Sequence, residues 1–558
     1  MATRETPEPA RRRAQTSSGQ TKVPGISIKP DYLRSWTEDT LNVKILDPLT
    51  AYQTSDQPAL SPSAFIADSL LIKGTDAETL AELTAVAKEA GFKLVADRRA
   101  SRDLRLLDKG GFTGEERAQL ESAYVRRVRL APASRPDEPV FKPIDIWRLL
   151  QAFRARVGRD SAAFAAVALE HPTSGNPHTA GHPHTAGHPH TAGHPHTAGH
   201  PALEEYATPG WGGRQPVSWH GSKPSPRYNL SGRTPRPLVA VLDTGVGEHP
   251  WFSPEFVERD PKVLGQAIGI KPPASWIDAS GTSERMTGDL DPDSGHGTFI
   301  AGLIRQACPE AKILDVRLYG GSGVVAEADL LRTLWLLAVR QILARKRGSG
   351  LQPVDVVSMS LGYYHELPED SAFDALLYAP LELLGRYGAA VVTSAGNDAT
   401  DRPSFPAAFA PYPGGRVTSV APGTLPVLAV AALNPDDTIA LFSNDGPWVH
   451  YTRPGAALVS TFPTTFDASL NPTNFLVNAA GEYRSSLDPD DFSAGFGVWS
   501  GTSFSAPVLA GELASALAMA YAAKDSDQST AAAVARMEGL IKALPGRTAR
   551  TVGHWRRS

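Results

Sequence analysis

The sequence predicts an α/β fold: a parallel sheet with helices on both faces, preceded by a small α+β domain. Three observations lead to this expectation. From about 208 to 525, continuous apolar runs alternate with helical patterns, as in parallel sheets that are buried on both faces. From about 65 to 170, strands and helices follow a different order. A low-complexity repeat separates the two regions, and 558 residues are too many for a single hydrophobic core.

The small domain follows residues 1–60, which are rich in Pro, Ser, Thr and charge and are expected to form a flexible lead-in. A capping box from Thr75 to Glu78 starts a helix, which Gly91 ends in the left-handed conformation. Strands are expected at Ser69–Lys73, Phe92–Val95, Tyr124–Leu130 and Phe164–Leu169, and a second helix at Ile144–Arg156. The order β-α-β-β-α-β is that of a ferredoxin-like domain.

A repeat of Pro-His-Thr-Ala-Gly-His occurs four times between Pro177 and His200, inside an expected linker over residues 171–207. Nine of the 15 histidines lie between His171 and His200. Proline at every sixth position prevents a regular helix or sheet, so a semi-extended linker is the first interpretation. A low-affinity binder of metal ions or protons is the alternative. The repeat fixes no ligand geometry, so we predict no metal site and no cofactor.

The parallel-sheet region has strand-like runs at Leu238–Leu242, Ile313–Leu318, Val354–Ser358, Ala389–Thr393 and Val427–Ala431. Helical patterns lie between them, at Ala328–Lys346 and Phe373–Tyr387. Residues 526–558 are expected to form a final helix, Thr530–Leu544, and a basic tail. This alternation of strands and helices predicts crossover connections between parallel strands.

Composition and charge give no reason to expect several classes of partner. The net charge of −4 gives no reason to expect nucleic acid or an anionic membrane as a partner. The sequence has no run of about 20 apolar residues that would predict a membrane span. The basic cluster Arg11–Arg13 is not followed by the apolar run of a signal peptide, and Cys308 is the single cysteine. We therefore expect a cytoplasmic protein, with an unrecognised export route as the alternative.

Three segments of the sheet region carry residues that could act together in catalysis. Asp243 follows the apolar run Val239–Leu242, so it lies at the end of a strand, where open α/β sheets place their sites. His296 lies between two glycines at the start of a helical run, and Ser503 precedes a helix of small residues. A serine nucleophile needs a base, and that base needs a carboxylate to orient it.

The segments VLDTGV, GHGT and GTSFSAPVLAG resemble the three signature blocks of the subtilases, over residues 230 to 520. This resemblance implies a subtilisin-like serine endopeptidase that cleaves protein or peptide substrates through an acyl-enzyme intermediate. Asp243, His296 and Ser503 would be its catalytic triad. The segment Thr393–Asn397 resembles the oxyanion block of the family. Asn397 and the backbone N–H of Ser503 would stabilise the developing oxyanion, a kind of stabilisation for which subtilisin itself is the usual example.

The resemblance also implies a substrate cleft. Ser358, Ser360, Leu361 and Gly362 match the strand that lines the first specificity pocket, and Gly321 and Gly323 match the edge that pairs with an extended peptide. Two features depart from the family. Arg453-Pro454-Gly455 replaces an Ala-Pro-Gly block, and a polar insertion occupies Pro463–Asp491. An acidic loop with Asp289, Asp291 and Asp293 could bind calcium, but a solvated acidic face is favoured.

Three alternatives follow from the same residues. An aspartic protease also uses Asp-Thr-Gly, but it needs two such motifs or a dimer, and one is present. A non-catalytic binding module on the same fold is the second alternative. The third concerns the small domain. In the family such a domain can act as an inhibitory prodomain that sends its last strand, here Val167–His171, to the active site. An accessory domain that recruits a partner is equally compatible with the sequence.

Overall fold

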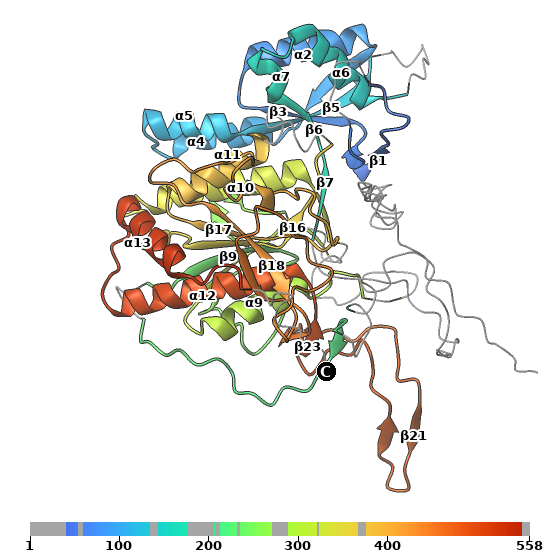
Figure 1. Cartoon of the computed structure of the whole chain (residues 1–558), viewed down its shortest axis with the longest axis vertical. Helices are drawn as coiled ribbons and strands as arrows, with labels where there is room; N and C mark the ends of the chain where they lie inside the picture. Colours follow the sequence, from blue (N-terminus) through green and yellow to red (C-terminus); the bar gives the residue numbers. More distant parts are fainter. Residues whose placement is uncertain are drawn as a thin grey trace, which may run out of the picture.

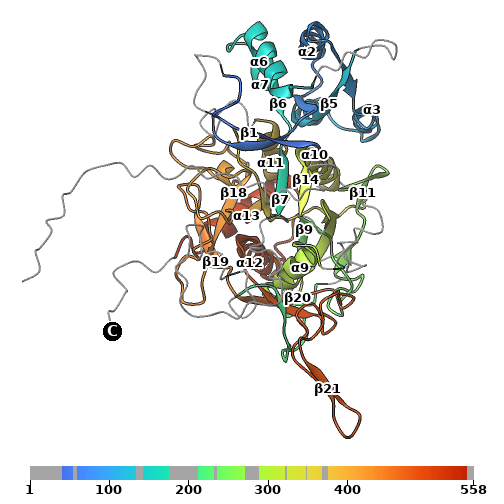
Figure 2. The same cartoon turned by 90° about the vertical axis from the view of Figure 1, so that its right-hand side faces the viewer.

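The structure is a computed structural model. It describes residues 41–53, 60–133, 143–175, 206, 212–230, 235–270, 288, 290–320, 323–346, 348–366 and 375–548. The repeat, most of the predicted lead-in, Gly321 and Asp289 lie outside these residues. In Figures 1 and 2 a large body with a central sheet carries a smaller unit at one end.

The large body is built on a sheet of seven parallel strands in the order β10-β13-β9-β15-β17-β18-β19. All residues of the three strands β9, β17 and β18 are buried, as expected for a sheet covered on both faces. The predicted parallel sheet is therefore confirmed. The strands are β9 Leu238–Asp243, β10 Val257–Glu258, β13 Lys312–Arg317, β15 Val356–Met359, β17 Ala390–Ser394, β18 Val427–Leu433 and β19 Tyr451–Pro454.

Helices cover both faces of this sheet. Alternate residues of β9 point to opposite sides: Leu238, Ala240 and Leu242 belong to one core with α10 and α11, whereas Val239 and Val241 belong to another with α9 and α12. This alternation is the period of a β-strand. The helices are α9 His296–Ala307, α10 Glu327–Ala344, α11 Ala375–Arg386, α12 Thr502–Ala522 and α13 Thr530–Ala543.

Helix α12 is the one described helix whose length and composition would suit a membrane span. Its most apolar 18-residue window is 67% buried inside the protein, where it packs against α9 and the central strands. The core helix of a folded domain can be as long and as apolar as a membrane span, so the burial of α12 in this fold explains its composition.

Smaller sheets surround the central one. Strand β7, Pro172–Gly175, lies between β14, Val324–Ala326, and β16, Leu361–Gly362. The predicted polar insertion forms the hairpin of β21 and β22, which projects from the body in Figure 2. The remaining elements are β8 Gln215–Pro216, β11 Lys262–Val263, β12 Gln266–Ala267, η4 Ala407–Phe409, β20 Leu458–Thr461, β21 Phe475–Val477, β22 Tyr483–Ser485 and β23 Phe496–Trp499.

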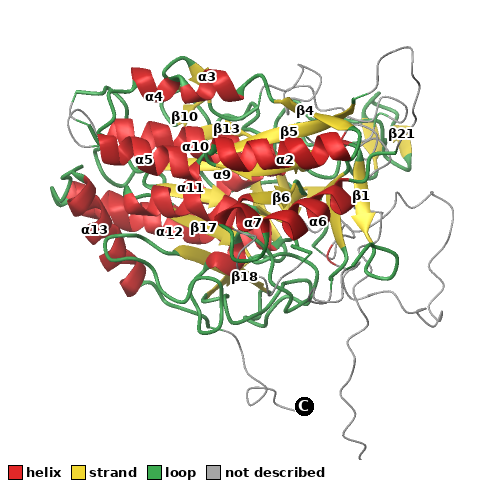
Figure 3. Cartoon of the chain, turned by 90° about the horizontal axis from the view of Figure 1, so that it is seen from above, coloured by secondary structure: helices red, strands yellow, loops and turns green. Residues whose placement is uncertain are grey.

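The smaller unit is an antiparallel sheet in the order β4-β5-β3-β6, on which α2 and α6 pack around a separate core (Figure 3). Gly91 ends α2 with a φ of 87°, as predicted. The elements are β3 Ser69–Lys73, α2 Ala77–Glu89, β4 Phe92–Ala96, β5 Val125–Pro132, α6 Ile146–Val157, α7 Ala162–Ala166 and β6 Val167–Leu169.

Two local predictions in this unit are wrong, and two further features of the structure were not predicted. The cap of α2 is Asp76 and not Thr75, because the Asp76 carboxylate accepts the N–H groups of Glu78 and Thr79. Residues 164–166 are helical, because Ser161 caps α7. Part of the lead-in is ordered as β1, Val43–Leu46, paired with β2, Ser63–Ile66. Three short helices between β4 and β5 were not predicted: α3 Ala100–Leu104, α4 Leu106–Lys109 and α5 Gly114–Ala123.

These extra helices join the small unit to the large body. The Trp335 indole of α10 donates a 2.8 Å hydrogen bond to the carbonyl of Leu120 in α5, and its ring meets Tyr124 edge-on. Arg332 of α10 forms two hydrogen bonds, of 2.7 and 2.8 Å, with the buried Asp103 carboxylate. Buried aromatic and bidentate arginine contacts of this kind make the two units a single packed structure.

Candidate active site

The carboxylate of Asp243 ends β9 at the carboxyl edge of the parallel sheet, as expected. Its side chain is 1% exposed. Oδ1 accepts the N–H of Thr244 at 2.8 Å, and Oδ2 accepts the hydroxyl of Tyr319 at 2.8 Å. The Nδ1 atom of His296 lies 2.8 Å from Oδ1 and 2.9 Å from Oδ2. The carboxylate is thus held by three groups in a buried position.

His296 is the first residue of α9, directly after Gly295, whose φ of 84° places it in the left-handed region. Gly297 allows the helix start to approach the end of β9, because a Cβ there would lie 2.4 Å from the carbonyl oxygen of Gly245. The imidazole packs against Trp499 and Phe504, with ring centroids 5.7 and 5.2 Å away. These contacts fix the ring beside the Asp243 carboxylate.

Ser503 is the second residue of α12, and its neighbour Phe504 is the residue that packs on the imidazole. The Ser503 hydroxyl lies 3.5 Å from the carbonyl of Ser360, and the Ser360 hydroxyl donates to the Ser503 carbonyl at 2.9 Å. The serine is therefore anchored to the chain around Ser360. The structure places the Asp243 carboxylate in contact with His296, and it places Ser503 directly before Phe504, which packs on the His296 ring.

Asn397 follows β17 and lies beside the start of α12. Its Oδ1 accepts the backbone N–H of Thr502 at 2.9 Å and the Thr502 hydroxyl at 2.8 Å. Because the oxygen end of the amide faces Thr502, the amide NH₂ end points away from that residue. The two hydrogen bonds from Thr502 therefore hold the Asn397 amide in one orientation.

The predicted cleft residues separate into two groups. Leu361 and Gly362 form β16 and pair with β7 of the same chain, opposite Gly175 and Ser174. Ser360 precedes them and contacts Ser503, as described above. Ser358 lies instead within β15 of the central sheet, between Val241 and Val392.

On the opposite edge of β7, Gly323 directly precedes β14, in which Val324 pairs with Ser174. A Cβ at Gly323 would collide with the carboxylate of Asp293. Gly321 lies outside the described residues.

Asp293 does not fit the interpretation of the acidic loop as a solvated face, whereas Asp291 is half-buried and Asp289 lies outside the described residues. Its side chain is buried, and a Cβ at Gly323 would meet its carboxylate. Burial raises the pKa of Asp293 to about 7, and the nearby charge of His296 opposes this rise. The carboxyl therefore titrates near neutrality next to the imidazole, a behaviour common at functional sites.

Sequence reasoning missed Tyr319 and Thr502 as contributors to the site, and it named Asp293 only as a member of the acidic loop. Tyr319 holds Asp243, Thr502 orients Asn397, and Asp293 lies near His296. Thr502 lies inside a quoted signature block, so that block could have suggested it. Tyr319 is 76 positions from Asp243, and no local pattern marks it.

Comparison with known proteins shows which family the chain is similar to. The profile of the subtilase family matches residues 235–557, which includes α13 and extends beyond the end expected from the motifs. Minor extracellular protease Epr of Bacillus subtilis (strain 168) is 27% identical over 42% of this chain, and thermitase of Thermoactinomyces vulgaris is 25% identical over 42%.

The aligned part spans 29% of the length of Epr and 69% of that of thermitase. A solved structure, described as the crystal structure of a lanthipeptide protease, is 17% identical and covers 53% of this chain and 78% of its own, with a TM-score of 0.33. The profile match covers more than half of the 558 residues. The chain belongs to the subtilase family of subtilisin-like serine peptidases.

Proposed function

We propose that this chain is a serine endopeptidase in which Ser503 is the nucleophile, His296 the general base and Asp243 the group that orients it. The observation that carries the proposal is the contact of His296 Nδ1 with both oxygens of the buried Asp243 carboxylate. That contact fixes the tautomer of the imidazole and stabilises the cation that forms when His296 accepts a proton.

The reaction follows from these roles. Ser503 Oγ forms a bond to the substrate carbonyl carbon while its proton passes to His296 Nε2. When the tetrahedral intermediate collapses, the C–N bond breaks and His296 donates that proton to the leaving amine. Water then repeats the sequence on the acyl-enzyme and releases the acid. Asn397 and the backbone N–H of Ser503 donate to the oxyanion in both halves of the reaction.

A fluorophosphonate probe and casein hydrolysis test this assignment. The wild-type chain should be labelled on Ser503, and Ser503→Ala should lose both labelling and hydrolysis. Ser505→Ala is a matched control, because Ser505 is a buried serine two positions further along α12 and takes no part in the proposed mechanism. Full activity in Ser503→Ala, or loss of labelling in both variants alike, would contradict the assignment.

We further infer that the small domain is a ferredoxin-like prodomain that inhibits the peptidase. Support comes from its strand order: the four strands, taken in chain order, lie as 2-3-1-4 and are antiparallel throughout. That order agrees with the β-α-β-β-α-β pattern. The domain is a proposed partner in the same chain, in addition to protein or peptide substrates.

Stronger support for inhibition comes from β7, which continues from β6 of the small domain. Ser174 of β7 pairs with Val324 on one side and Gly362 on the other. Gly362 is itself assigned to the cleft, and Val324 directly follows the assigned Gly323. Thr173 is fully buried there, and its hydroxyl donates to the Val325 carbonyl at 3.1 Å. An extended segment between two cleft edges uses the backbone bonds that a substrate peptide would need.

A proline in β7 tests this inhibition in the full chain. Ser174→Pro removes the backbone N–H at the residue that faces both edges, whereas Ser174→Ala leaves the backbone unchanged. Ser174→Pro should raise the hydrolysis of a small chromogenic peptide by the uncut chain, and Ser174→Ala should not. In parallel, wild type should be cut between about 165 and 235 while Ser503→Ala stays whole. If the uncut wild-type chain is already fully active, the accessory-domain alternative is correct.

A further inference from the structure

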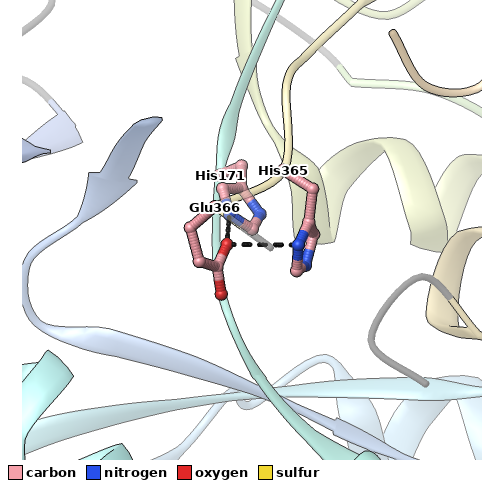
Figure 4. Close-up of side chains that lie close together, drawn as sticks. All are labelled: His171, His365 and Glu366. Atoms are coloured by element: carbon pink, nitrogen blue, oxygen red, sulfur yellow. Dashed lines mark hydrogen bonds and ion pairs between the residues drawn. The ribbon is translucent and has the colours of Figure 1, made fainter. Parts of the chain in front are cut away.

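A buried cluster of His171, His365 and Glu366 lies where the small domain enters the large body (Figure 4). His171 lies between β6 and β7, whereas His365 and Glu366 follow β16. Their exposed fractions are 2%, 2% and 0%. The cluster therefore connects the start of β7, which follows the small domain, to the segment that follows β16.

Ligand atoms of these three side chains converge. His171 Nε2 lies 2.9 Å from Glu366 Oε2, and His365 Nδ1 lies 3.5 Å from the same oxygen. One ligand atom from each residue lies within 4.8 Å of the others. Two atoms bound to one tetrahedral zinc ion, each at about 2.1 Å, are separated by roughly 3.4 Å. The two distances to Glu366 Oε2 fall on either side of this value.

A fourth residue orients the cluster from outside. Glu327 Oε2 lies 3.0 Å from His171 Nδ1 and accepts the backbone N–H of His171 at 3.0 Å. The Tyr363 hydroxyl donates a 3.3 Å hydrogen bond to the other carboxylate oxygen of Glu327, Oε1. With Nδ1 held by Glu327, Nε2 is the ring nitrogen that faces Glu366. A carboxylate behind a histidine ligand is the usual outer shell of a zinc site.

Glu366 supplies an independent observation. Its Oε1 atom is buried and has no hydrogen-bond partner among the residues that the structure describes. A buried carboxylate oxygen without a partner is costly, and a bound cation would satisfy it.

We propose that His171, His365 and Glu366 bind one zinc-type divalent cation, and that this ion clasps β7 and the small domain to the peptidase body. Two imidazoles and one carboxylate suit a borderline transition metal ion, whereas calcium and magnesium require an oxygen-rich shell. Without the ion, burial would lower the pKa of His171, but Glu327 and Glu366 raise it to about 10. The metal ion must therefore displace the proton on Nε2.

Cobalt(II) titration of the full Ser503→Ala chain tests the site without self-cleavage. The eight repeat histidines between 177 and 200 are changed to Asn in every sample, so that they do not bind the added ion. We expect one equivalent of cobalt with the intense visible absorption of a four-coordinate ion, which one equivalent of zinc should abolish. His365→Asn should lose this band. His249→Asn, which removes a buried imidazole elsewhere, should keep it.

A second variant keeps the test decisive if His365→Asn fails to fold. Glu327→Gln preserves a hydrogen-bond acceptor for His171 but removes the charge, so cobalt affinity should fall about 10- to 100-fold with unchanged one-to-one stoichiometry. Removal of zinc with a chelator should also increase trypsin cleavage at the joint between the two units. Absence of the four-coordinate band, or an equal band in His365→Asn, would overturn the proposal. Because Ser503 is absent throughout, neither result depends on peptidase activity.

Discussion

His296 and His171 are both buried imidazoles beside carboxylates, but the carboxylates surround the two rings differently. At His296, both oxygens of one carboxylate, Asp243, face the Nδ1 atom. At His171, two different carboxylates face the two ring nitrogens, Glu327 at Nδ1 and Glu366 at Nε2. The first arrangement orients the ring from one side, whereas the second holds it from both sides.

This difference fits the two proposed roles: His296 would exchange protons during catalysis, whereas His171 would hold two segments of the chain together. A carboxylate on Nδ1 alone favours the imidazolium only when a proton arrives at Nε2. In the absence of a metal ion, the two carboxylates at His171 raise its pKa to about 10 against the effect of burial, so the ring keeps its proton across the physiological range unless a metal ion replaces that proton. The first site suits proton transfer, and the second suits a permanent cation, whether a proton or a metal ion.

The largest expected effect on activity comes from replacing His296 or His171 by a residue that does not titrate. His296→Ala should lower kcat by about 10⁶-fold, and the double variant His296→Ala/Ser503→Ala should be no worse, because the two act as one unit. His171→Asn should instead raise the activity of the uncut chain, because it weakens the hold on β7. Single-turnover assays with a peptide ester measure both. A His171→Asn chain as inactive as His296→Ala would remove the distinction between the two sites.

The second effect concerns the donor beside Ser503. Asn397→Leu keeps the approximate size of the side chain but removes the amide, so kcat should fall about 100- to 1,000-fold with a nearly constant KM. Steady-state kinetics on a small peptide substrate separates the two constants. A raised KM with unchanged kcat would make Asn397 a residue that binds the ground state.

The third effect concerns the support of Asp243. Tyr319→Phe removes one hydrogen bond to a charged group, worth about 1.5–3 kcal/mol, and kcat/KM should fall roughly tenfold. The Tyr319 hydroxyl shares the negative charge of Asp243, so without it the carboxylate attracts the imidazolium more strongly. The acid limb of the kcat/KM profile should therefore move to higher pH. A purely structural role would lower activity without moving that limb.

The smallest effect on turnover is expected at Asp293, where stability is the better measurement. Burial raises the pKa of Asp293 from 3.8 to about 7, so the folded chain retains a proton that the unfolded chain has already lost. Stability from this group is present below pH 3.8 and is lost as pH rises to about 7. Each pKa unit corresponds to about 1.4 kcal/mol.

Urea unfolding in the Ser503→Ala background should show this loss, and Asp293→Asn should abolish it. The free energies of unfolding of the two chains should diverge between about pH 4 and pH 7 and then run parallel. Parallel curves across the whole range would mean that the pKa of Asp293 is the same in the folded and unfolded chains.

Much of the large body could be predicted from its sequence, because short stretches of sequence determine its strands and its candidate site residues. Strands such as Leu238–Asp243 are continuous apolar runs, and the residues proposed for catalysis lie in short sequence blocks. Asp243 ends a strand, whereas His296 and Ser503 lie in the first turns of helices. The small domain is harder to predict, because α3 to α5 have few apolar residues and are stabilised by packing into the core of the large body. Their pattern alone does not predict a buried face.

The least predictable features join residues far apart in the chain. Glu327 and Glu366 lie 156 and 195 positions from His171, and no motif marks any of them. In the sequence, His171 stands at the edge of a histidine-rich repeat and resembles the histidines of that repeat. Only the pairing of β7 with β14 and β16 separates it from the histidines that follow.

The place of β7 between β14 and β16 also has a consequence for the order of synthesis. On the ribosome, β7 is made before either neighbour, and Ser503 follows Gly175 by 328 residues. At about 5–20 residues per second, the nucleophile emerges roughly 15–65 s after the strand. A newly made chain therefore contains β7, the proposed occupant of the cleft, before β14 and β16 are made, and Ser503, the proposed nucleophile, follows all three strands.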